Sequence, residues 1–358
     1  MLQPASLSLF RRVFDKNLDI QAGSCSLPRR RKSSPRQLRV YQVIYRCMST
    51  RRYPRCILAT CCVPWNEDFT FAEGIFRRQV RHLISQGIRD LYIFGTAGEG
   101  YAVSDRQFDE ITRVFLDETC DPGVQTMTGV ISLSLTTVIE RIERARALGA
   151  RRFQLSLPSW GALRGSELDV FFRETCGRFP DCEFLHYNLQ RAQRLITPSE
   201  YGRLAERHPN LVATKNSTAD TQRLRGLLTE APQLRHFITE AGFAEASMMG
   251  ECGLLVSVMN TNLALGRAYF EAGCRHDRTA LAETGREASE LIAELLKLAG
   301  PEAHMDGAFD KMFCRVNDPQ FPLRLLPPYA GATEAVFEQF AQLLKEKYPR
   351  WSPPRNKR

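Results

Sequence analysis

A lysine that closes a short apolar segment is the most reactive candidate in this sequence. Lys215 follows Leu211, Val212 and Ala213, which predicts a buried strand with the lysine at its end. Burial disfavours the charged ammonium group and lowers its pKa, and the neutral amine can then attack a carbonyl carbon. The alternative without a catalytic role is a structural lysine that extends toward solvent or pairs with an acid such as Glu240.

A tyrosine stands at the end of the preceding apolar segment. Tyr187 comes 28 residues before Lys215, within the segment His186, Tyr187, Asn188. If both segments are neighbouring parallel strands, the two side chains meet at one edge of the sheet, where a phenol can relay protons to an amine adduct. The alternative is a tyrosine at the rim whose hydroxyl is satisfied by the protein.

A glycine-containing turn supplies a third element. Gly95, Thr96, Ala97, Gly98 and Glu99 follow an earlier apolar segment. Two glycines in a tight turn allow backbone N–H groups to face one point, and the threonine adds a hydroxyl, which together make a cradle for a small carboxylate. On its own the pattern also fits a simple turn with Glu99 in solvent.

Eight apolar segments alternate with helical patterns along the chain. The candidate residues stand at the ends of these segments, so the segments determine where the candidates lie. We expect strands at 56–63, 90–95, 124–129, 152–157, 183–188, 211–215, 235–239 and 254–258. Continuous apolar runs separated by helices are typical of buried parallel strands, and eight such units predict a (β/α)8 TIM barrel. The candidate residues fall at carboxyl ends of strands, where such barrels carry their sites. A doubly wound open sheet is the second choice, although no GxGxxG follows the first strand.

Boundary signals support the helices between these strands. Gly87 ends one helical pattern, Ser104 with Gln107 fits a capping box, and Thr136 or Thr137 is expected to cap the next helix. Thr197, followed by a proline and then Glu200, marks another start. Three further patterns at 263–272, 278–299 and 334–347 predict a C-terminal helical extension, interrupted by glycine and proline pairs.

The charge of +9 is concentrated near the N-terminus. Residues 1–55 carry +11, and the remaining chain carries −2. We expect a basic leader at 1–50, a barrel at 51–273, a helical subdomain at 274–347 and a polar tail at 348–358. The leader has the composition of an organelle transit peptide, a flexible basic arm, a disordered tail or an over-extended start, with Met48 as the alternative start. We expect a cytoplasmic protein with organelle targeting as the alternative, and no membrane span.

The eleven cysteines include no CxxC pair. Most lie in apolar segments, so we expect reduced structural thiols and no metal site.

With these residues in place, the chain resembles the dihydrodipicolinate synthase/N-acetylneuraminate lyase superfamily of Schiff-base lyases. The turn with sequence GTAGE is similar to the family's pyruvate-binding GxxGE, and the segments around Tyr187 and Lys215 are similar to its tyrosine and lysine motifs. The resemblance covers roughly residues 56–347, and the three motifs agree in order and spacing.

The resemblance implies a mechanism and a set of site residues. Lys215 would form an imine with pyruvate or a related 2-oxo acid, Tyr187 would shuttle protons, and Thr96 would contact Tyr187. Aldol addition, retro-aldol cleavage or dehydration would follow, without a metal or organic cofactor. The implied substrate-binding residues are Gly95, Thr96, Ala97, Gly98, Glu99, Trp160 and Ser257. A homodimer or homotetramer is the implied assembly.

Three departures separate the chain from the synthase itself. Many members have a second threonine where Ala97 stands, and a tyrosine pair where Ser159 and Trp160 stand. By our count Ala192 takes the position of the synthase's substrate arginine, with Arg191 and Arg194 nearby.

Two classes of function therefore compete. The first is a Schiff-base lyase or aldolase on a 2-oxo acid, with acylneuraminates, keto-deoxy sugar acids and hydroxy-oxoglutarate as substrate candidates. The alternative is a catalytically weakened barrel that binds a 2-oxo acid as a sensor or structural partner, which Trp160 motivates. Nucleic-acid binding is disfavoured because the body is nearly neutral.

Overall fold

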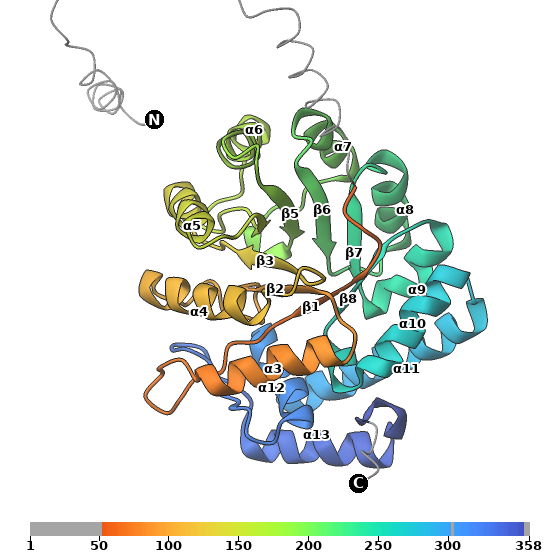
Figure 1. The fold of residues 1–358 in the computed structure, drawn as a ribbon. Coiled ribbons are helices and arrows are strands. Elements are labelled where there is room, and N and C mark those ends of the chain that lie inside the picture. The colour runs from red at the N-terminus through yellow and green to blue at the C-terminus, as the bar shows by residue number, and fades with distance from the viewer. Residues whose placement is uncertain (1–51, 302–303, 354–358) are drawn as a thin grey trace, which may run out of the picture. The chain divides into compact units, whose positions relative to one another are not determined.

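Eight parallel strands form a closed barrel in the computed structural model, which describes residues 52–301 and 304–353 (Figure 1). The expected leader at 1–50 and the start at Met48 lie outside the described residues. The strands are β1 (Ile57–Thr60), β2 (Asp90–Ile93), β3 (Gln125–Gly129), β4 (Arg152–Leu155), β5 (Glu183–Asn188), β6 (Leu211–Asn216), β7 (Arg235–Thr239) and β8 (Gly253–Val256).

The strands follow one another around the barrel in chain order. Each pairs in parallel with the next, and β1 closes the ring against β8. Because all eight run the same way, their carboxyl ends meet at one mouth. The predicted TIM barrel is confirmed, and every predicted apolar segment overlaps one strand.

The helices between the strands lie outside the ring, as Figure 1 shows. They are α3 (Glu73–Ser85), α4 (Asp105–Glu118), α5 (Leu135–Ala147), α6 (Gly165–Phe172) with η1 (Arg173–Gly177), α7 (Pro198–Arg207), α8 (Thr221–Glu230), α9 (Glu240–Met249) and α10 (Leu263–Arg275). Short 3-10 turns η2 (Gln190–Ala192) and η3 (Val258–Thr261) follow β5 and β8.

The capping predictions have mixed outcomes. Ser104 with Gln107 and Thr197 with Glu200 both form capping boxes, as predicted. The prediction of Thr136 or Thr137 as a cap is wrong, because Ser134 caps α5 by accepting a hydrogen bond from the Thr137 N–H group. The helix starts earlier than its apolar residues indicate, since its first turn faces solvent.

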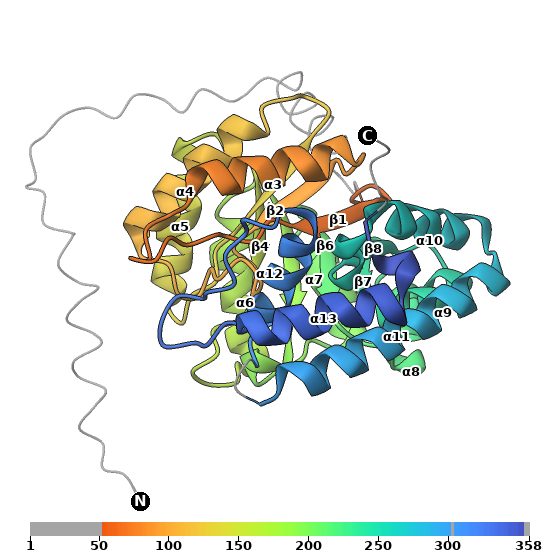
Figure 2. The ribbon, with the colours of Figure 1, turned by 90° about the horizontal axis from the view of Figure 1, so that it is seen from below.

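A helical region follows the barrel, as predicted. It comprises α11 (Arg278–Ala299), α12 (Asp306–Asn317), α13 (Glu334–Glu346) and η4 (Pro349–Trp351). Figure 2 shows α13 alongside α11, whereas α12 packs against η3. Because η3 directly follows β8, α12 lies near the barrel mouth. The sequence reasoning did not predict α12.

The end of the described chain differs from the expected polar tail. Trp351 is fully buried, and its Nε1 donates a hydrogen bond to Glu287 Oε2 at 3.0 Å. This contact attaches η4 to α11.

Apolar side chains fill the barrel below the mouth. Leu185, Ala213 and Leu255 belong to one buried cluster contributed mainly by the strands. Because side chains alternate along a strand, Tyr187 and Lys215, two residues further along β5 and β6, point to the same side and stand one layer nearer the mouth. The fold thus places both candidates over an apolar layer.

The nine cysteines in the described part of the chain are free thiols, and most are buried. No group of three or more metal-binding side chains comes together among these residues. No described helix is both long and apolar enough to cross a membrane.

Candidate active site

Lys215 is buried at the end of β6 in an environment that favours its neutral form. Its Nζ donates a hydrogen bond to Tyr92 Oη at 2.8 Å and lies 3.8 Å from the centroid of the Tyr187 ring. Burial lowers the pKa of Lys215 to about 8, against the raising effects of Asp306 and Asp310. No pairing with Glu240 occurs, so the expected alternative of that ion pair is wrong for the described structure.

Tyr92 on β2 is a partner of the lysine that the sequence reasoning missed. Its ring lies so close to the turn after β2 that a Cβ on Gly95 would stand 2.7 Å from it. Glycine at this position therefore leaves room for the ring whose hydroxyl holds the Lys215 amine. A polar aromatic residue between the apolar residues Leu91 and Ile93 was the available signal.

Tyr187 and Lys215 occupy the same register on β5 and β6. The predicted juxtaposition of the two side chains is therefore present. Burial raises the pKa of Tyr187 to about 12, and hydrogen bonding with the side chains of Ser217 and Thr96 opposes this rise. The phenol thus remains protonated at neutral pH and lies within reach of Thr96.

The turn at 95–99 is buried and held tightly. A Cβ on Gly98 would lie 2.7 Å from the Phe94 nitrogen, so only glycine fits there without a shift of the backbone. The N–H groups of Thr96 and Ala97 donate to no protein acceptor within the described residues. They remain available to an anion, as the cradle prediction requires.

Glu99 points away from solvent and into the protein. Its carboxylate accepts hydrogen bonds from Trp65 Nε1, the Leu326 N–H group and Lys311 Nζ. The simple-turn alternative with an exposed Glu99 is therefore wrong. The acid attaches the turn to α12, and it lines neither of the two cavities described below.

Helix α12 brings two further carboxylates to the mouth. Asp310 is buried, and its Oδ1 accepts a hydrogen bond from Ser257 Oγ at 3.0 Å. Asp306, one turn earlier, pairs with Arg191 at 3.3 Å. The Ser257 hydroxyl group therefore contacts Asp310 at the barrel mouth. The Ser257 N–H group donates a hydrogen bond to the buried Glu240.

Two cavities open at the mouth. The larger, about 890 Å³, is lined by Thr96, Ser159, Arg191 and several other hydroxyl-bearing residues. The smaller, about 470 Å³, is lined by Tyr187, Asn216, Asp306 and again Arg191. Arg191 therefore stands between them, where it also donates to the His304 carbonyl oxygen at 3.2 Å.

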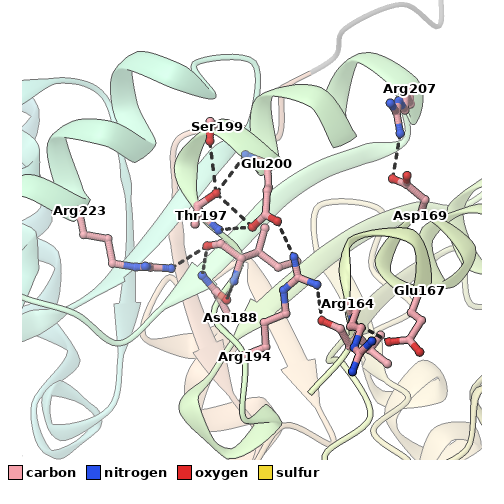
Figure 3. A network of polar contacts seen from close by, with 12 residues as sticks. Arg164, Glu167, Asp169, Asn188, Arg194, Thr197, Ser199, Glu200, Arg207 and Arg223 are labelled. Atoms are coloured by element: carbon pink, nitrogen blue, oxygen red, sulfur yellow. Dashed lines mark hydrogen bonds and ion pairs between the residues drawn. The ribbon is translucent and has the colours of Figure 1, made fainter. Parts of the chain in front are cut away.

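The loop after β5 is fixed by a polar network (Figure 3). Asn188 exchanges hydrogen bonds with the backbone of Ile196, and Arg223 donates to the Ile196 oxygen at 2.8 Å. Arg194 turns away from the mouth to Glu200 and the Leu163 oxygen. Of the two arginines considered from sequence, Arg191 is the one at the cavities, and Ala192 is buried in η2.

Trp160 lies apart from these groups. Its side chain is 86% exposed and lines neither cavity, whereas its neighbour Ser159 lines the larger one. The predicted substrate-binding role of Trp160 has no contact to support it within this single chain.

The site can be compared with known proteins at this point. The family model for the dihydrodipicolinate synthetase family matches residues 54–344. The chain belongs to this family. The match includes the barrel, the turn at 95–99 and all of α12.

Curated relatives are distant members. A 4-hydroxy-tetrahydrodipicolinate synthase of Prochlorococcus marinus is 26% identical over 205 residues, which are 57% of this chain and 64% of that protein. An N-acetylneuraminate lyase of Fusobacterium nucleatum is 24% identical over 69% of this chain and 89% of that protein. The first relatives are thus matched over slightly less than two thirds of their length.

Solved structures share the fold. YagE, a prophage protein of the dihydrodipicolinic acid synthase family from E. coli K12, solved in complex with pyruvate, superimposes with a TM-score of 0.74 at 17% identity. An N-acetylneuraminate lyase of Proteus mirabilis gives 0.72 at 16% identity. Each alignment covers 82% of this chain and 98% of the other. This member of the dihydrodipicolinate synthetase family is therefore not a close match to the synthase.

Proposed function

We propose that this chain is a Schiff-base-forming lyase or aldolase that acts on pyruvate or a related 2-oxo acid. The observation that carries the proposal is the buried amine of Lys215, which lies 2.8 Å from Tyr92 Oη and against the ring of Tyr187 at the mouth of a closed barrel. Membership of the dihydrodipicolinate synthetase family supports the same chemistry.

The reaction would begin with the neutral amine. Lys215 Nζ adds to the C2 carbonyl carbon, and the resulting carbinolamine loses water to give an iminium. Tyr187 carries protons to and from the adduct, with Thr96 holding its hydroxyl. The substrate carboxylate lies against the free N–H groups of Thr96 and Ala97. The positive nitrogen then accepts electrons from the neighbouring carbon, which permits aldol addition, retro-aldol cleavage or dehydration.

The larger cavity supports a substrate that extends beyond pyruvate. Ser132, Ser134, Ser156 and Tyr329 line it together with Arg191. Hydroxyl groups and a cation suit a hydroxylated acid, so sugar-derived 2-oxo acids and hydroxy-oxoglutarate both stay candidates. The alanine at 97 removes one hydroxyl from the carboxylate site but keeps the backbone donors.

We extend the proposal to assembly and location. Trp160 and Leu133 are large, exposed apolar side chains, and Leu133 lines the larger cavity at the mouth. Such residues suit a contact between copies, so we propose a homodimer or homotetramer. A cytoplasmic location remains the expectation for the chain, with organelle targeting as its alternative.

Trapping with borohydride tests the function. We expect full-length protein incubated with pyruvate and borohydride to gain one reduced adduct on Lys215, detected by peptide mass spectrometry. Lys311 is an internal control, because it is also buried but is paired with Glu99. Lys215→Ala should lose the adduct while keeping its circular dichroism spectrum.

The absence of an adduct would change the assignment. If folded wild-type protein forms none with pyruvate or with a panel of larger 2-oxo acids, the enzyme proposal fails. Saturable binding of a 2-oxo acid without an adduct would instead support the weakened barrel that serves as a sensor or structural partner.

A further inference from the structure

The Lys215 nitrogen has one hydrogen-bond partner inside the barrel. Its Nζ donates to Tyr92 Oη at 2.8 Å, and the two side chains come from β6 and β2, on different sides of the ring of strands. Among the residues that the structure describes, no other group forms a hydrogen bond or an ion pair with this nitrogen. The phenol oxygen of Tyr92 therefore contacts the atom that would carry the imine.

Tyr92 is held in place by its surroundings. Its side chain is 2% exposed and belongs to the buried cluster inside the barrel, together with Met127 and Phe237. The turn after β2 closes over the ring, since a Cβ on Gly95 would stand 2.7 Å from Tyr92 Cε2. A phenol enclosed in this way keeps its oxygen at one position, so the direction of its contact with Lys215 is fixed.

The two tyrosines contact the amine in different ways. Lys215 Nζ lies 3.8 Å from the centroid of the Tyr187 ring, so Tyr187 presents the face of its ring to the nitrogen. The Tyr187 hydroxyl group interacts instead with Thr96 and Ser217. Tyr92 presents its oxygen to the nitrogen. The two phenols therefore serve different parts of an adduct, because the Tyr92 oxygen contacts its nitrogen while the Tyr187 hydroxyl is available to the atoms around C2.

We propose that Tyr92 holds the Lys215 nitrogen throughout the reaction and accepts the N–H group of its iminium, an inference that rests on the function proposed above. The neutral amine has two N–H bonds, and one of these protons moves to the carbonyl oxygen when the carbinolamine forms. The carbinolamine hydroxyl group then takes a proton from Tyr187 and leaves as water, while the nitrogen lone pair forms the C=N bond. Tyr187 recovers its proton from solvent. The second N–H bond stays intact, and Tyr92 accepts its hydrogen bond without exchanging a proton.

This hydrogen bond sets the plane of the iminium. An iminium is planar, so its N–H bond lies in one plane with C2 and the two groups attached to C2. Tyr92 fixes the direction of the N–H bond, and the free N–H groups of Thr96 and Ala97 are available to hold the substrate carboxylate. With the plane held at both ends, one face of C2 is turned toward the barrel mouth, and a reagent approaches from that face.

Trapping full-length protein with pyruvate and cyanoborohydride identifies the face that is attacked. Reduction creates a stereocentre at the former C2, so the wild type should give one diastereomer of carboxyethyl-lysine at position 215. Tyr92→Phe removes one oxygen and keeps the ring, so the plane of the iminium can turn over. We expect the ratio of the two diastereomers to fall by about tenfold or more, because a hydrogen bond to a charged group is lost. Hydrolysis of the trapped peptide followed by chiral chromatography measures this ratio.

The pH dependence of trapping gives a second readout. The nitrogen is a cation both as the ammonium group before reaction and as the iminium after it, and Tyr92→Phe removes the acceptor of both. The acid and alkaline limbs of the profile should therefore both move to lower pH, by on the order of one unit. The variant leaves the other titratable groups that face this pair unchanged, which are Asp306 and Asp310 on α12, Tyr187 on β5 and Cys62 after β1.

Two other phenols provide the comparison. Tyr187→Phe keeps its ring face toward the nitrogen, so it should slow trapping without moving the two limbs. Tyr348→Phe removes a buried phenol that lines neither cavity at the mouth, and it should change neither the limbs nor the diastereomer ratio. Limbs that move as far in Tyr187→Phe as in Tyr92→Phe would overturn the assignment of the nitrogen to Tyr92.

The proposal can also fail on the two main proteins. An unchanged diastereomer ratio or unchanged limbs in folded Tyr92→Phe protein would overturn the role of Tyr92. A wild type that yields both diastereomers in equal amounts would overturn it as well, and this measurement needs no variant to fold. The absence of any adduct in the wild type contradicts the proposed function instead.

Discussion

Lys311 and Glu99 form an ion pair in which both side chains are fully buried. The lysine comes from α12 and the glutamate from the turn after β2, so the pair joins the C-terminal helical region to the barrel mouth. Lys311 also donates to the Arg324 oxygen, and Glu99 accepts from Trp65 and from the Leu326 N–H group. Burial lowers the pKa of Lys311, and the charge of Glu99 opposes this.

Removing one partner of this ion pair should lower the stability of the fold. We expect Lys311→Met to lower the free energy of unfolding by about 3–5 kcal/mol, because the Glu99 carboxylate is left buried without its cation. Urea unfolding followed by circular dichroism measures the change. Arg286→Ala, which breaks the exposed pair with Glu290, should leave the midpoint unchanged. Equal midpoints for both variants would contradict this account.

Tyr187→Phe tests proton transfer separately from imine formation. The phenyl ring keeps the packing against Lys215 but removes the hydroxyl. We expect the exchange of pyruvate methyl protons for deuterium, followed by NMR, to slow by about a hundredfold or more. Tyr348→Phe removes a phenol that lines neither cavity and should leave the exchange rate unaffected. Exchange at the wild-type rate in Tyr187→Phe would remove the tyrosine from the mechanism.

Arg191 should distinguish substrates by their distal charge. It lines both cavities and pairs with Asp306, a carboxylate that a second substrate carboxylate can replace. We expect Arg191→Ala to weaken adduct formation with 2-oxoglutarate by about tenfold or more relative to pyruvate. Arg173→Ala, an exposed change of the same charge on η1, serves as the control. An equal loss of adduct formation with both acids would show that Arg191 does not bind a second substrate carboxylate.

Two buried histidines make the barrel sensitive to acid. Burial lowers the pKa of His186 to about 3 and that of His236 to about 4. The unfolded chain binds protons near pH 6.5, and the folded chain does not until lower pH, so stability falls as the pH drops below about 6.5.

The loss of stability at acid pH is large enough to measure. At pH 5 each histidine should remove about 2 kcal/mol from the free energy of unfolding relative to neutral pH. Urea titrations of the wild type and of His236→Gln at both pH values give the comparison. His236→Gln should lose less stability on acidification than the wild type, and an equal loss would exclude His236 as a source.

The barrel and the lysine–tyrosine pair were predictable because their signals are local. Apolar runs mark the strands, and the alternation along β5 and β6 puts Tyr187 and Lys215 on one side. Helix α12 was not predictable in the same way. Its buried residues include Ala308, Asp310, Lys311 and Met312, so it is enclosed on several faces and shows no clean amphipathic period.

Two buried residues near the site were missed in the sequence for the same reason, which is that they lie on α12 and have no local signal. Nothing local in the sequence marks Asp310 and Lys311 as buried, because burial of a charge depends on partners far away in the chain. Lys311 meets Glu99 across 212 positions, and Asp310 meets Ser257 across 53. The free N–H groups at Thr96 and Ala97 were predictable, since a glycine turn after a strand is a local signal.

Helix α12 is synthesised after the strands that carry Tyr187 and Lys215. Lys215 and Tyr187 leave the ribosome about a hundred residues before Asp310 and Lys311, because synthesis runs from the N-terminus. A nascent or prematurely terminated chain therefore has the nucleophile without the helix that caps and charges its surroundings.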